Sequence, residues 1–567
     1  MPEPHTHYFE VQMKVTDFSQ PYVDFKMAVW TPGSYLIREF SKSVEGFSAQ
    51  NGSGQALKYE KTKKNTWRVF AENTKSITIS YRVYAFEASV RTSIADASHG
   101  YINPTSVCMF VPQLSQNPLT VKIVPFKDWK NISTGLEPAG ADKFTLKADN
   151  YDMLADCPIE VGNHKVLIFR ADGGTQYEMA MYGDANYNET QLIADMKTVV
   201  EETGKVVGEN PNKRYVFLVH HYTNGSGGLE HKNSTTLDVS RNTYQANYAG
   251  FLSLVAHEYF HLWNVKRIRA KALGPFDYEN ENYTHLLWVA EGFTTYYQNL
   301  ILRRAGIITA DSFVTITNNN IGTIENQPGN AVQSLAESSF DAWIKYYRTN
   351  ENSNNTTVSY YTKGAVVGCL LDLEIINATN GEKNLDDVFK FLYNEYFKKQ
   401  QRGFTDEEMQ QAVEKVAGKS MKDFFENHIS DTKTIDYNRI FGYAGFRMSQ
   451  VPVSNGEGYL GANFNLTNGK LLVTSTLRGA SAYTYGLNVN DEILAADGLR
   501  INSAEELNRL AESKRAGEKI SLLISRDNLI KTLEITLGKS PQVRYKLEKL
   551  NNLTEKQQKI QQKWLRL

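Results

Sequence analysis

The stretch from Leu252 to Val265, LSLVAHEYFHLWNV, holds the most informative pattern in the chain, because His257 and His261 are four residues apart and Glu258 stands between them. The stretch contains no proline or glycine, which favours a helix. Residues four apart lie on one face of a helix, so both imidazoles can bind one metal ion while the carboxylate reaches a nearby water molecule. The pattern predicts a zinc hydrolase in which Glu258 is the base. Two buried structural histidines are the alternative.

A catalytic zinc ion usually has three protein ligands and one open position, so a third ligand is needed. A second helix is predicted from Leu286 to Arg304 (LLWVAEGFTTYYQNLILRR), and in it Glu291 stands among apolar residues. A carboxylate is costly to bury unless it is paired or binds a cation. Glu279 and Glu281 are less favoured because they belong to the polar run DYENENY. We therefore expect one zinc ion per chain, held by the two histidines and Glu291.

The length and composition of the chain limit its class. With 567 residues it exceeds what one hydrophobic core serves, and about three or four domains are expected. Hydrophobic residues make up 41% and charged residues 22%, a globular composition. The net charge of -1 does not favour nucleic acid, and apolar runs fall short of the roughly 20 residues that a membrane span needs. We expect a soluble protein without a nucleic-acid partner or a membrane span.

Cysteine content and the N-terminal residues bear on the compartment. Cys108, Cys157 and Cys369 form no disulfide framework and no zinc-binding pair, and a single Cys108–Cys157 disulfide is left open. The start MPEPHTHYFEV lacks the apolar region of a secretory signal. A cytoplasmic protein and a periplasmic one whose leader has been removed are both left open.

The hydropathy pattern changes along the chain and predicts four parts. Residues 1–160 alternate apolar and polar positions in short runs such as SITISYRVYAF, which is typical of antiparallel sheets. Residues 161–445 contain a few strands and then long helical stretches. Residues 446–540 return to strands, with one helix from Ser503 to Ser513 that opens with a capping-box pattern, and residues 541–567 read as a polar helical tail. The predicted fold class is multidomain α+β.

The motifs HEYFH and WVAEGFTTYY resemble the gluzincin aminopeptidases, in which a helix pair supplies two histidines and a glutamate to zinc. The long segment between them, NVKRIRAKALGPFDYENENYTHLLW, is similar to the glycyl aminopeptidase family of these zinc metallopeptidases, whose members carry a PDZ module near their end. The resemblance implies a thermolysin-like, mainly helical catalytic domain between an N-terminal β domain and a C-terminal PDZ domain. It also implies a zinc aminopeptidase that favours small N-terminal residues such as Gly or Ala.

The sequence GGLEH at positions 227–231 resembles the substrate-recognition strand of this clan. The resemblance implies that Gly227 and Gly228 let the peptide backbone approach and that Glu230 binds the free α-amino group. A carboxylate suits this task because a charge-assisted hydrogen bond orients the peptide and rejects chains without a free amine. The better-known branch has Asn where this chain has His231, so the resemblance leaves the shape of the first subsite open.

A pair of tyrosines, Tyr360 and Tyr361, precedes Lys363 and Gly364 at the start of a predicted helix. A neutral phenol can donate a hydrogen bond to the oxyanion that develops beside the metal. Similarity to the clan's Tyr-x-Lys-Gly motif implies that Tyr361 is this donor, with Tyr360 as the alternative.

The expected mechanism follows from these roles. Glu258 takes a proton from a metal-activated water that attacks the first peptide carbonyl, and it returns the proton to the leaving amine. The aromatic residues Phe110, Tyr101 and Tyr222 are candidates for a shallow first subsite.

Three other histidines lie close to these motifs. His220 and His221 end the apolar strand RYVFLVHHY just before the glycine-rich turn and could line the cleft, and His285 precedes the second helix and could neighbour the site, but packing is favoured over a catalytic role for all three.

The C-terminal module resembles a PDZ domain, on the residues Tyr459 to Ala462 and on the pattern from Gly486 to Gly498. Such domains accept an extended peptide as an added strand. The resemblance implies that the N–H groups of Leu460, Gly461 and Ala462 bind a terminal carboxylate. The expected partners are a peptide substrate with a free N-terminus and a protein C-terminal tail in the PDZ groove, unless the tail helix of this chain blocks it.

Two other functions are compatible with the sequence. One is a zinc endopeptidase to which the PDZ module delivers protein substrates. The other is a peptide-binding scaffold without catalysis, against which the intact Glu258 argues.

Overall fold

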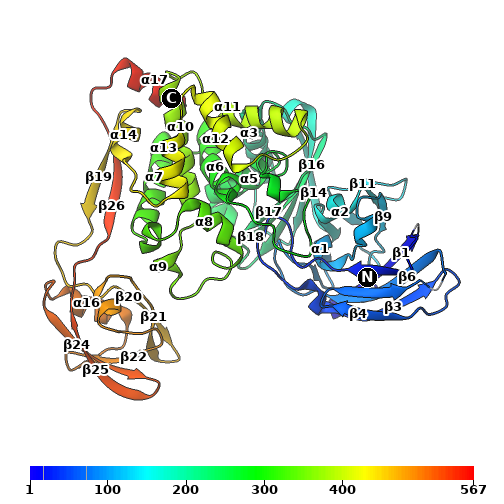
Figure 1. Cartoon of the computed structure of the whole chain (residues 1–567), viewed down its shortest axis with the longest axis horizontal. Coiled ribbons are helices and arrows are strands. Elements are labelled where there is room, and N and C mark those ends of the chain that lie inside the picture. The colour runs from blue at the N-terminus through cyan, green and yellow to red at the C-terminus, as the bar shows by residue number, and fades with distance from the viewer. Residues whose placement is uncertain (17, 72, 567) are drawn as a thin grey trace. The chain divides into compact units, whose positions relative to one another are not determined.

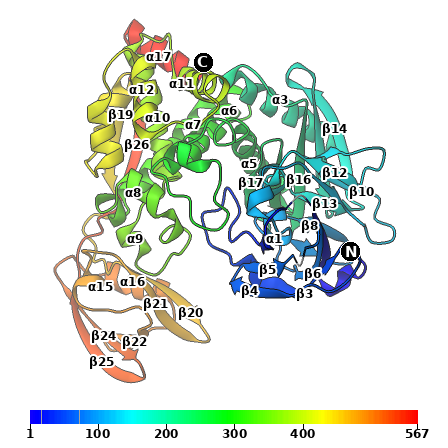
Figure 2. The same ribbon diagram turned by 45° about the vertical axis from the view of Figure 1, so that its right-hand side comes forward.

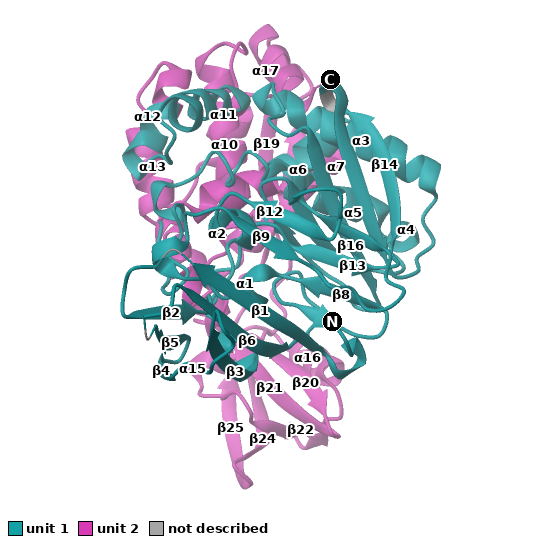
Figure 3. Ribbon diagram, turned by 90° about the vertical axis from the view of Figure 1, so that its right-hand side faces the viewer, with its two compact units in different colours: residues 1–284, 297–308, 386–412 teal, residues 285–296, 309–385, 413–567 magenta. Residues whose placement is uncertain are grey.

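Figure 1 shows the chain as a computed structural model, which describes residues 1–16, 18–71 and 73–566. The chain forms two compact units, coloured separately in Figure 3. Unit 1 contains residues 1–284, 297–308 and 386–412, and unit 2 contains residues 285–296, 309–385 and 413–567. The helical stretch made of η6 (Trp288–Gly292) and α6 (Phe293–Arg304) contributes residues to both. The predicted boundaries near residues 160, 445 and 540 remain predictions.

The N-terminal β region of unit 1 is antiparallel throughout, as its alternating pattern predicts. In β6, the residues Ile77, Ile79, Tyr81 and Val83 are buried and the positions between them are more exposed, so one face packs on a core. Two three-stranded sheets have the orders β1-β6-β3 and β2-β5-β4. Their strands are β1 (Tyr8–Thr16), β2 (Tyr22–Lys26), β3 (Val44–Asn51), β4 (Tyr59–Lys63), β5 (Thr66–Phe70) and β6 (Ser76–Tyr84).

Two smaller sheets and two short helices complete this β region. The sheets have the orders β10-β13-β8-β7 and β11-β12-β9. Their strands are β7 (Ile94–Ala95), β8 (His99–Ile102), β9 (Leu119–Lys122), β10 (Asn131–Thr134), β11 (Glu137–Pro138), β12 (Thr145–Ala148) and β13 (Ile159–Gly162). The helices are α1 (Pro104–Val107) and α2 (Tyr151–Ala155), and α2 ends at Asp156. The N-terminal antiparallel part of the predicted fold class is confirmed.

The second sheet region of unit 1 has the order β14-β15-β16-β18-β17. Strand β16 runs parallel to both of its neighbours, and its residues are buried on both faces, which explains its continuous apolar run RYVFLVHHY. The edge strand β17 carries the GGLEH motif and contacts helix α5, which carries HEYFH (Figure 2). The elements are β14 (Lys165–Ala171), β15 (Thr175–Tyr182), α3 (Glu189–Val207), β16 (Arg214–Tyr222), β17 (Gly228–Glu230), β18 (Ser234–Ser240), α4 (Thr243–Ala246) and α5 (Tyr248–Phe260).

Helices dominate the first part of unit 2. Its central helix is α10 (Thr362–Ala378), in which every residue from Lys363 to Ile376 is buried. A helix that is mostly apolar on all faces needs such an interior position. The other helices of this part are α7 (Ala310–Glu325), α8 (Leu335–Phe340), α9 (Ser353–Thr356), α13 (Lys422–Phe425) and α14 (Tyr437–Gly442), whereas α11 (Leu385–Leu392) and α12 (Asp406–Ala417) lie mainly in unit 1.

The C-terminal module is a sheet with the order β20-β21-β22-β24-β25, to which β23 adds at β22 (Figure 2). Helix α16 begins at Ser503, whose side chain accepts a hydrogen bond from the N–H of Glu506. The carboxylate of Glu506 bonds to the N–H of Asn502 rather than completing the predicted box at Ser503. The elements are β20 (Ala462–Thr467), β21 (Lys470–Thr476), α15 (Ser481–Thr484), β22 (Glu492–Ala496), β23 (Leu499–Arg500), α16 (Ala504–Glu512), β24 (Lys519–Arg526) and β25 (Leu529–Thr536).

The last part of the chain differs from the predicted helical tail. Strand β26 (Val543–Lys549) pairs with β19 (Phe446–Pro452), so the helix begins only at α17 (Glu555–Leu565). Helix α17 contacts α10, and the indole N–H of Trp564 donates a hydrogen bond to the hydroxyl of Tyr296 at 3.1 Å. The sequence left open whether the tail helix blocks the PDZ groove, and in the structure this helix packs on the helical part of unit 2 instead.

Two further expectations concern the whole chain. Cys108, Cys157 and Cys369 are free thiols, so the disulfide that the sequence left open does not form. Over the described ranges, no helix combines the length and the apolarity needed to cross a membrane.

Candidate active site

Helix α5 presents the two predicted metal-binding histidines on one face. The side chain of Asn247 caps its start by accepting a hydrogen bond from the N–H of Gly250. His257 lies in the last turn, and His261 follows the last helical residue while keeping a helical conformation. Both are buried, and their ring centroids are 4.8 Å apart. The spacing of four residues therefore places the rings side by side, as predicted.

Each imidazole is fixed by one hydrogen bond from its Nδ1 atom. Nδ1 of His257 lies 2.6 Å from Oε1 of Gln298, and Nδ1 of His261 lies 2.6 Å from the backbone oxygen of Asn264. These oxygens can only accept, so both Nδ1 atoms carry the proton. In a neutral ring held in this way, Nε2 carries the lone pair, and this is the tautomer that binds a metal ion through Nε2.

Glu291 is the third predicted metal ligand. It lies in the π-helical turn η6 and is 2% exposed. One ligand atom each from His257, His261 and Glu291 lie within 4.8 Å of one another. Two neutral imidazoles and one carboxylate are a donor set of catalytic zinc sites, so these residues fit a zinc ion. The less favoured Glu279 forms an ion pair with Lys26 at 2.6 Å instead.

Two glycines allow η6 and α10 to approach closely. A Cβ atom on Gly292 would lie 2.4 Å from Cα of Gly364, closer than real side chains come. Gly292 follows Glu291 directly, and Gly364 belongs to the Tyr-x-Lys-Gly motif, so the contact brings Tyr361 towards Glu291. Burial, and next the charge of Glu291, raise the pKa of the Tyr361 phenol well above its usual range, so it stays a neutral donor. Tyr360 is completely buried, whereas Tyr361 is partly exposed.

Strand β17 passes directly beside the predicted base. A Cβ atom on Gly228 would lie 2.3 Å from the carboxyl carbon of Glu258. Any larger residue at position 228 would therefore clash with the side chain of Glu258. Gly227, the residue before it, has a φ of 113°, which favours glycine. Glu258 is 5% exposed. One ligand atom each from Glu258, Glu230 and His261 lie within 4.8 Å of one another. The predicted base, the predicted amine anchor and a predicted metal ligand are therefore neighbours.

Glu230 ends strand β17 and is 4% exposed. Among residues 1–16, 18–71 and 73–566, no group donates a hydrogen bond to its carboxylate or forms an ion pair with it. A buried carboxylate without a partner is unfavourable, so this position suits a cation from outside the chain. Glu230 also lines a pocket of about 670 Å³.

The aromatic residues that the sequence suggested for the first subsite lie elsewhere. Tyr101 is 1% exposed and hydrogen-bonds to the hydroxyl of Thr236, and Phe110 stacks on Tyr151 in the N-terminal core. Tyr222 packs near the ring of His220. The aromatic residues that line the pocket of Glu230 are Tyr35, Phe276, Tyr278 and Phe397. Phe276 and Tyr278 lie in the long segment between the HEYFH and WVAEGFTTYY motifs, but no spacing in the sequence assigned either of them to the first subsite.

A buried charge network holds His220. Its Nδ1 lies 2.9 Å from Oδ1 of Asp238, and its Nε2 lies 3.2 Å from Oε2 of Glu160. The other carboxylate oxygen of Glu160 bonds to His99. Burial alone would lower the pKa of His220, but the hydrogen bonds to Asp238 and Glu160 raise it to about 9. Both nitrogens are occupied, so His220 is a structural cation and not a metal ligand.

Two other histidines are also structural. His221 uses both ring nitrogens, with the backbone oxygen of Tyr182 and the hydroxyl of Tyr244 as partners. The ring of His285 stacks on Phe340. The packing interpretation favoured from the sequence holds for both.

Sequence reasoning did not find the residues that orient the histidines. Gln298 follows Glu291 by seven residues, two helical turns further on the same face, so helical periodicity could have indicated it. Asn264 acts through its backbone oxygen, for which the residue type gives no signal.

The three predicted PDZ residues lie at the start of the module. Leu460 is 2% exposed and packs in the core of the module, and Gly461 has a φ of 73°. The backbone oxygen of Leu460 accepts from the N–H of Ala482, and that of Gly461 accepts from the N–H of Leu477. Ala462 begins β20. That their N–H groups bind a carboxylate stays a prediction.

Comparisons with known proteins follow the predicted order of parts. Family models match for the peptidase M61 N-terminal domain at residues 1–163, for the M61 glycyl aminopeptidase at residues 250–367 and for a PDZ domain at residues 458–537. The crystal structure of an aminopeptidase N family protein from Idiomarina loihiensis is 30% identical, with a TM-score of 0.90, and covers 100% of this chain and 98% of that one. An M1 zinc metallopeptidase from Deinococcus radiodurans is 12% identical, with a TM-score of 0.46 over 74% of this chain and 89% of that one. No curated protein matches the chain.

The contact between Gly228 and Glu258 predicts the effect of one methyl group. Gly228→Ala places a Cβ atom 2.3 Å from the carboxyl carbon of Glu258 and must displace the base. We expect kcat to fall about 100-fold, because a small displacement of a catalytic group is costly, while zinc content stays unchanged. Gly140→Ala is the control, since no atom lies within 4 Å of its added Cβ. Wild-type kcat in Gly228→Ala would contradict this placement of Glu258.

The network of His220 predicts how stability depends on pH. A folded-state pKa of about 9, above the usual value of about 6.5, means that protonated His220 stabilises the fold fully below pH ~6.5 and that this contribution is lost as pH rises towards 9. The urea midpoint of the wild type should therefore fall between pH 6.5 and 9 by more than that of His220→Gln. His5→Gln, at an exposed position, should follow the wild type. Equal slopes in all three proteins would rule the network out as the cause.

Proposed function

The chain belongs to the M61 glycyl aminopeptidase family and is a peptidase, and from this premise we propose that it is a zinc-dependent aminopeptidase that removes small N-terminal residues, Gly and Ala. The observation that carries the proposal is the buried carboxylate of Glu230, which has no partner in the described part of the chain. Its ligand atom lies within 4.8 Å of those of Glu258 and His261, so an α-ammonium bound there presents the first peptide bond to the base. The preference for Gly and Ala rests on the family description alone.

The proposed metal site consists of His257, His261 and Glu291, which would hold one zinc ion. When bound, the ion supplies Lewis acidity, which polarises a carbonyl oxygen and makes a water molecule more acidic. The chain contributes the orientation of its ligands, because Gln298 and the backbone of Asn264 accept hydrogen bonds from the Nδ1 atoms and so direct Nε2 of each imidazole towards metal binding.

Proton transfer is the proposed task of Glu258. It accepts a proton from the attacking water and later delivers it to the leaving amine. Its carboxylate is buried and fixed against Gly228, so it needs little rearrangement before the reaction. Tyr361 donates a hydrogen bond from its neutral phenol to the oxyanion that forms on the carbonyl.

Selection of the bond to be cut is the proposed task of Glu230. An α-ammonium can donate charge-assisted hydrogen bonds to this carboxylate, whereas an acetylated N-terminus carries no charge and cannot offset its burial. The proposed substrate is therefore a peptide with a free N-terminus. The proposed partner of the PDZ module is a protein C-terminal tail, bound at Leu460, Gly461 and Ala462.

One assay tests the proposal directly. The rates of cleavage of Ala-anilide and N-acetyl-Ala-anilide are compared with and without a zinc chelator, and Glu258→Gln supplies the background. We expect the acetylated substrate to be cleaved at least about 100-fold more slowly, because it leaves the buried carboxylate without a partner. Glu230→Gln should remove most of this discrimination.

The same assay separates the other functions. Equal, chelator-sensitive rates on both substrates would support an endopeptidase and contradict an aminopeptidase. Absence of chelator-sensitive cleavage of any anilide or peptide would favour a binding scaffold. Faster cleavage of Leu- or Phe-anilide than of Gly- and Ala-anilide would contradict only the proposed preference for small residues.

A further inference from the structure

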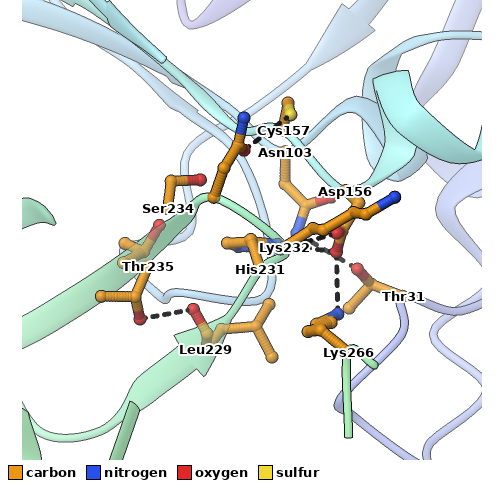
Figure 4. Close-up of polar contacts among 12 residues, drawn as sticks. Thr31, Asn103, Asp156, Cys157, Leu229, His231, Lys232, Ser234, Thr235 and Lys266 are labelled. Carbon is orange, nitrogen blue, oxygen red and sulfur yellow. Dashed lines mark hydrogen bonds and ion pairs between the residues drawn. The ribbon is translucent and has the colours of Figure 1, made fainter. Parts of the chain in front are cut away.

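A lysine that the proposed reaction does not use lies close to the amine anchor. The side chain of Lys266 is 7% exposed and lines the same pocket as Glu230. Its Nζ atom bonds to Oδ1 of Asp156 at 2.7 Å (Figure 4) and forms no ion pair with Glu230 in the described structure. Burial alone would lower the pKa of Lys266, but the charges of Asp156 and, next, of Glu230 raise it. Both carboxylates therefore attract the same ammonium group, and Asp156 binds it.

Asp156 is itself firmly held. Its Oδ2 accepts a hydrogen bond from the N–H of Lys232 at 2.8 Å, and its Oδ1 lies 3.3 Å from Nδ1 of His231. These two residues directly follow Glu230, and Figure 4 shows Asp156 beside both of them and Lys266. Lys266 and His231 hold the pKa of Asp156 well below its usual range, although burial opposes its ionisation. The carboxylate of Asp156 thus links three segments, which are the end of α2, the residues after strand β17 and the residues after helix α5.

The backbone of Lys266 is fixed near the metal ligands. Its N–H donates a hydrogen bond to the backbone oxygen of His261 at 3.1 Å. The preceding residue, Val265, has a φ of 142°, a conformation that a β-branched residue rarely adopts and that the surrounding structure must enforce. With the backbone fixed, a change of partner between Asp156 and Glu230 would need only a movement of the long Lys266 side chain. A tethered ammonium has a high effective concentration, so it would compete with the ammonium of a dissolved substrate for Glu230.

We propose that Asp156 is a positioning residue that binds and neutralises Lys266, so that Glu230 stays open for the α-ammonium of the substrate. The inference rests on the proposed role of Glu230 as the amine anchor. It also gives the N-terminal β region a part in substrate binding, because α2 and Asp156 belong to that region.

A double-mutant cycle tests the proposal. Asp156→Asn keeps an oxygen for the N–H of Lys232 but removes the charge that holds Lys266. We expect the KM for Ala-anilide to rise about tenfold while kcat changes less than about twofold, because only the free anchor is lost. Adding Lys266→Met should return KM to within about threefold of the wild type, which a general folding defect would not allow.

A matched control shows whether the identity of the lysine matters. Lys398 lines the same pocket but pairs with Glu209, so Asp156→Asn with Lys398→Met should keep the raised KM. An unchanged KM in Asp156→Asn, or no recovery with Lys266→Met, would overturn the proposal.

A folding failure of the single variant leaves the proposal testable. The double variant replaces a buried ion pair by neutral groups, which proteins often tolerate. A KM of this variant close to that of the wild type supports the proposal, and a KM raised about tenfold overturns it, because Asp156 would then act without Lys266. Failure of the proposed function is recognised separately, since it appears in the wild type as equal cleavage of free and acetylated anilides.

Discussion

The proposed activity depends on three buried side chains, His257, His261 and Glu291, whose potential ligand atoms lie within 4.8 Å of one another. Buried imidazoles and a carboxylate at such distances are stable when hydrogen bonds and a cation satisfy them. Several otherwise unrelated features serve this convergence. The Nδ1 hydrogen bonds orient both rings, and the glycine pair between η6 and α10 brings Tyr361 towards Glu291.

Negatively and positively charged side chains alternate around Glu230, the proposed anchor of the substrate amine. Glu230 has no partner in the described part of the chain, Lys266 is bound by Asp156, and Asp156 is bound in turn by the residues that follow Glu230. Asp156 comes from the N-terminal β region, so residues well outside the segment that carries the HEYFH motif support the proposed amine anchor.

The sequence predicted what depends on local pattern and on the cost of burying charge. Four-residue spacing indicated His257 and His261, and a lone acid in an apolar helix indicated Glu291. What it missed depends on partners distant in the chain or on the backbone. Val543–Lys549 pairs with β19 as a strand although its composition suits a helix, and α17 docks on α10 through Trp564 rather than on the PDZ module. The ion pair of Asp156 and Lys266 joins positions 110 residues apart and follows no motif.

The central claim is that these three side chains bind one zinc ion. X-ray absorption spectroscopy of the zinc-loaded protein, with metal content measured on the same sample, tests it most directly. The account predicts one zinc per chain, with two imidazole nitrogens at about 2.0–2.1 Å and a carboxylate oxygen at about 2.0–2.2 Å, and loss of this signal in Glu291→Ala. A zinc ion without imidazole ligands, or an unchanged spectrum in Glu291→Ala, would contradict it.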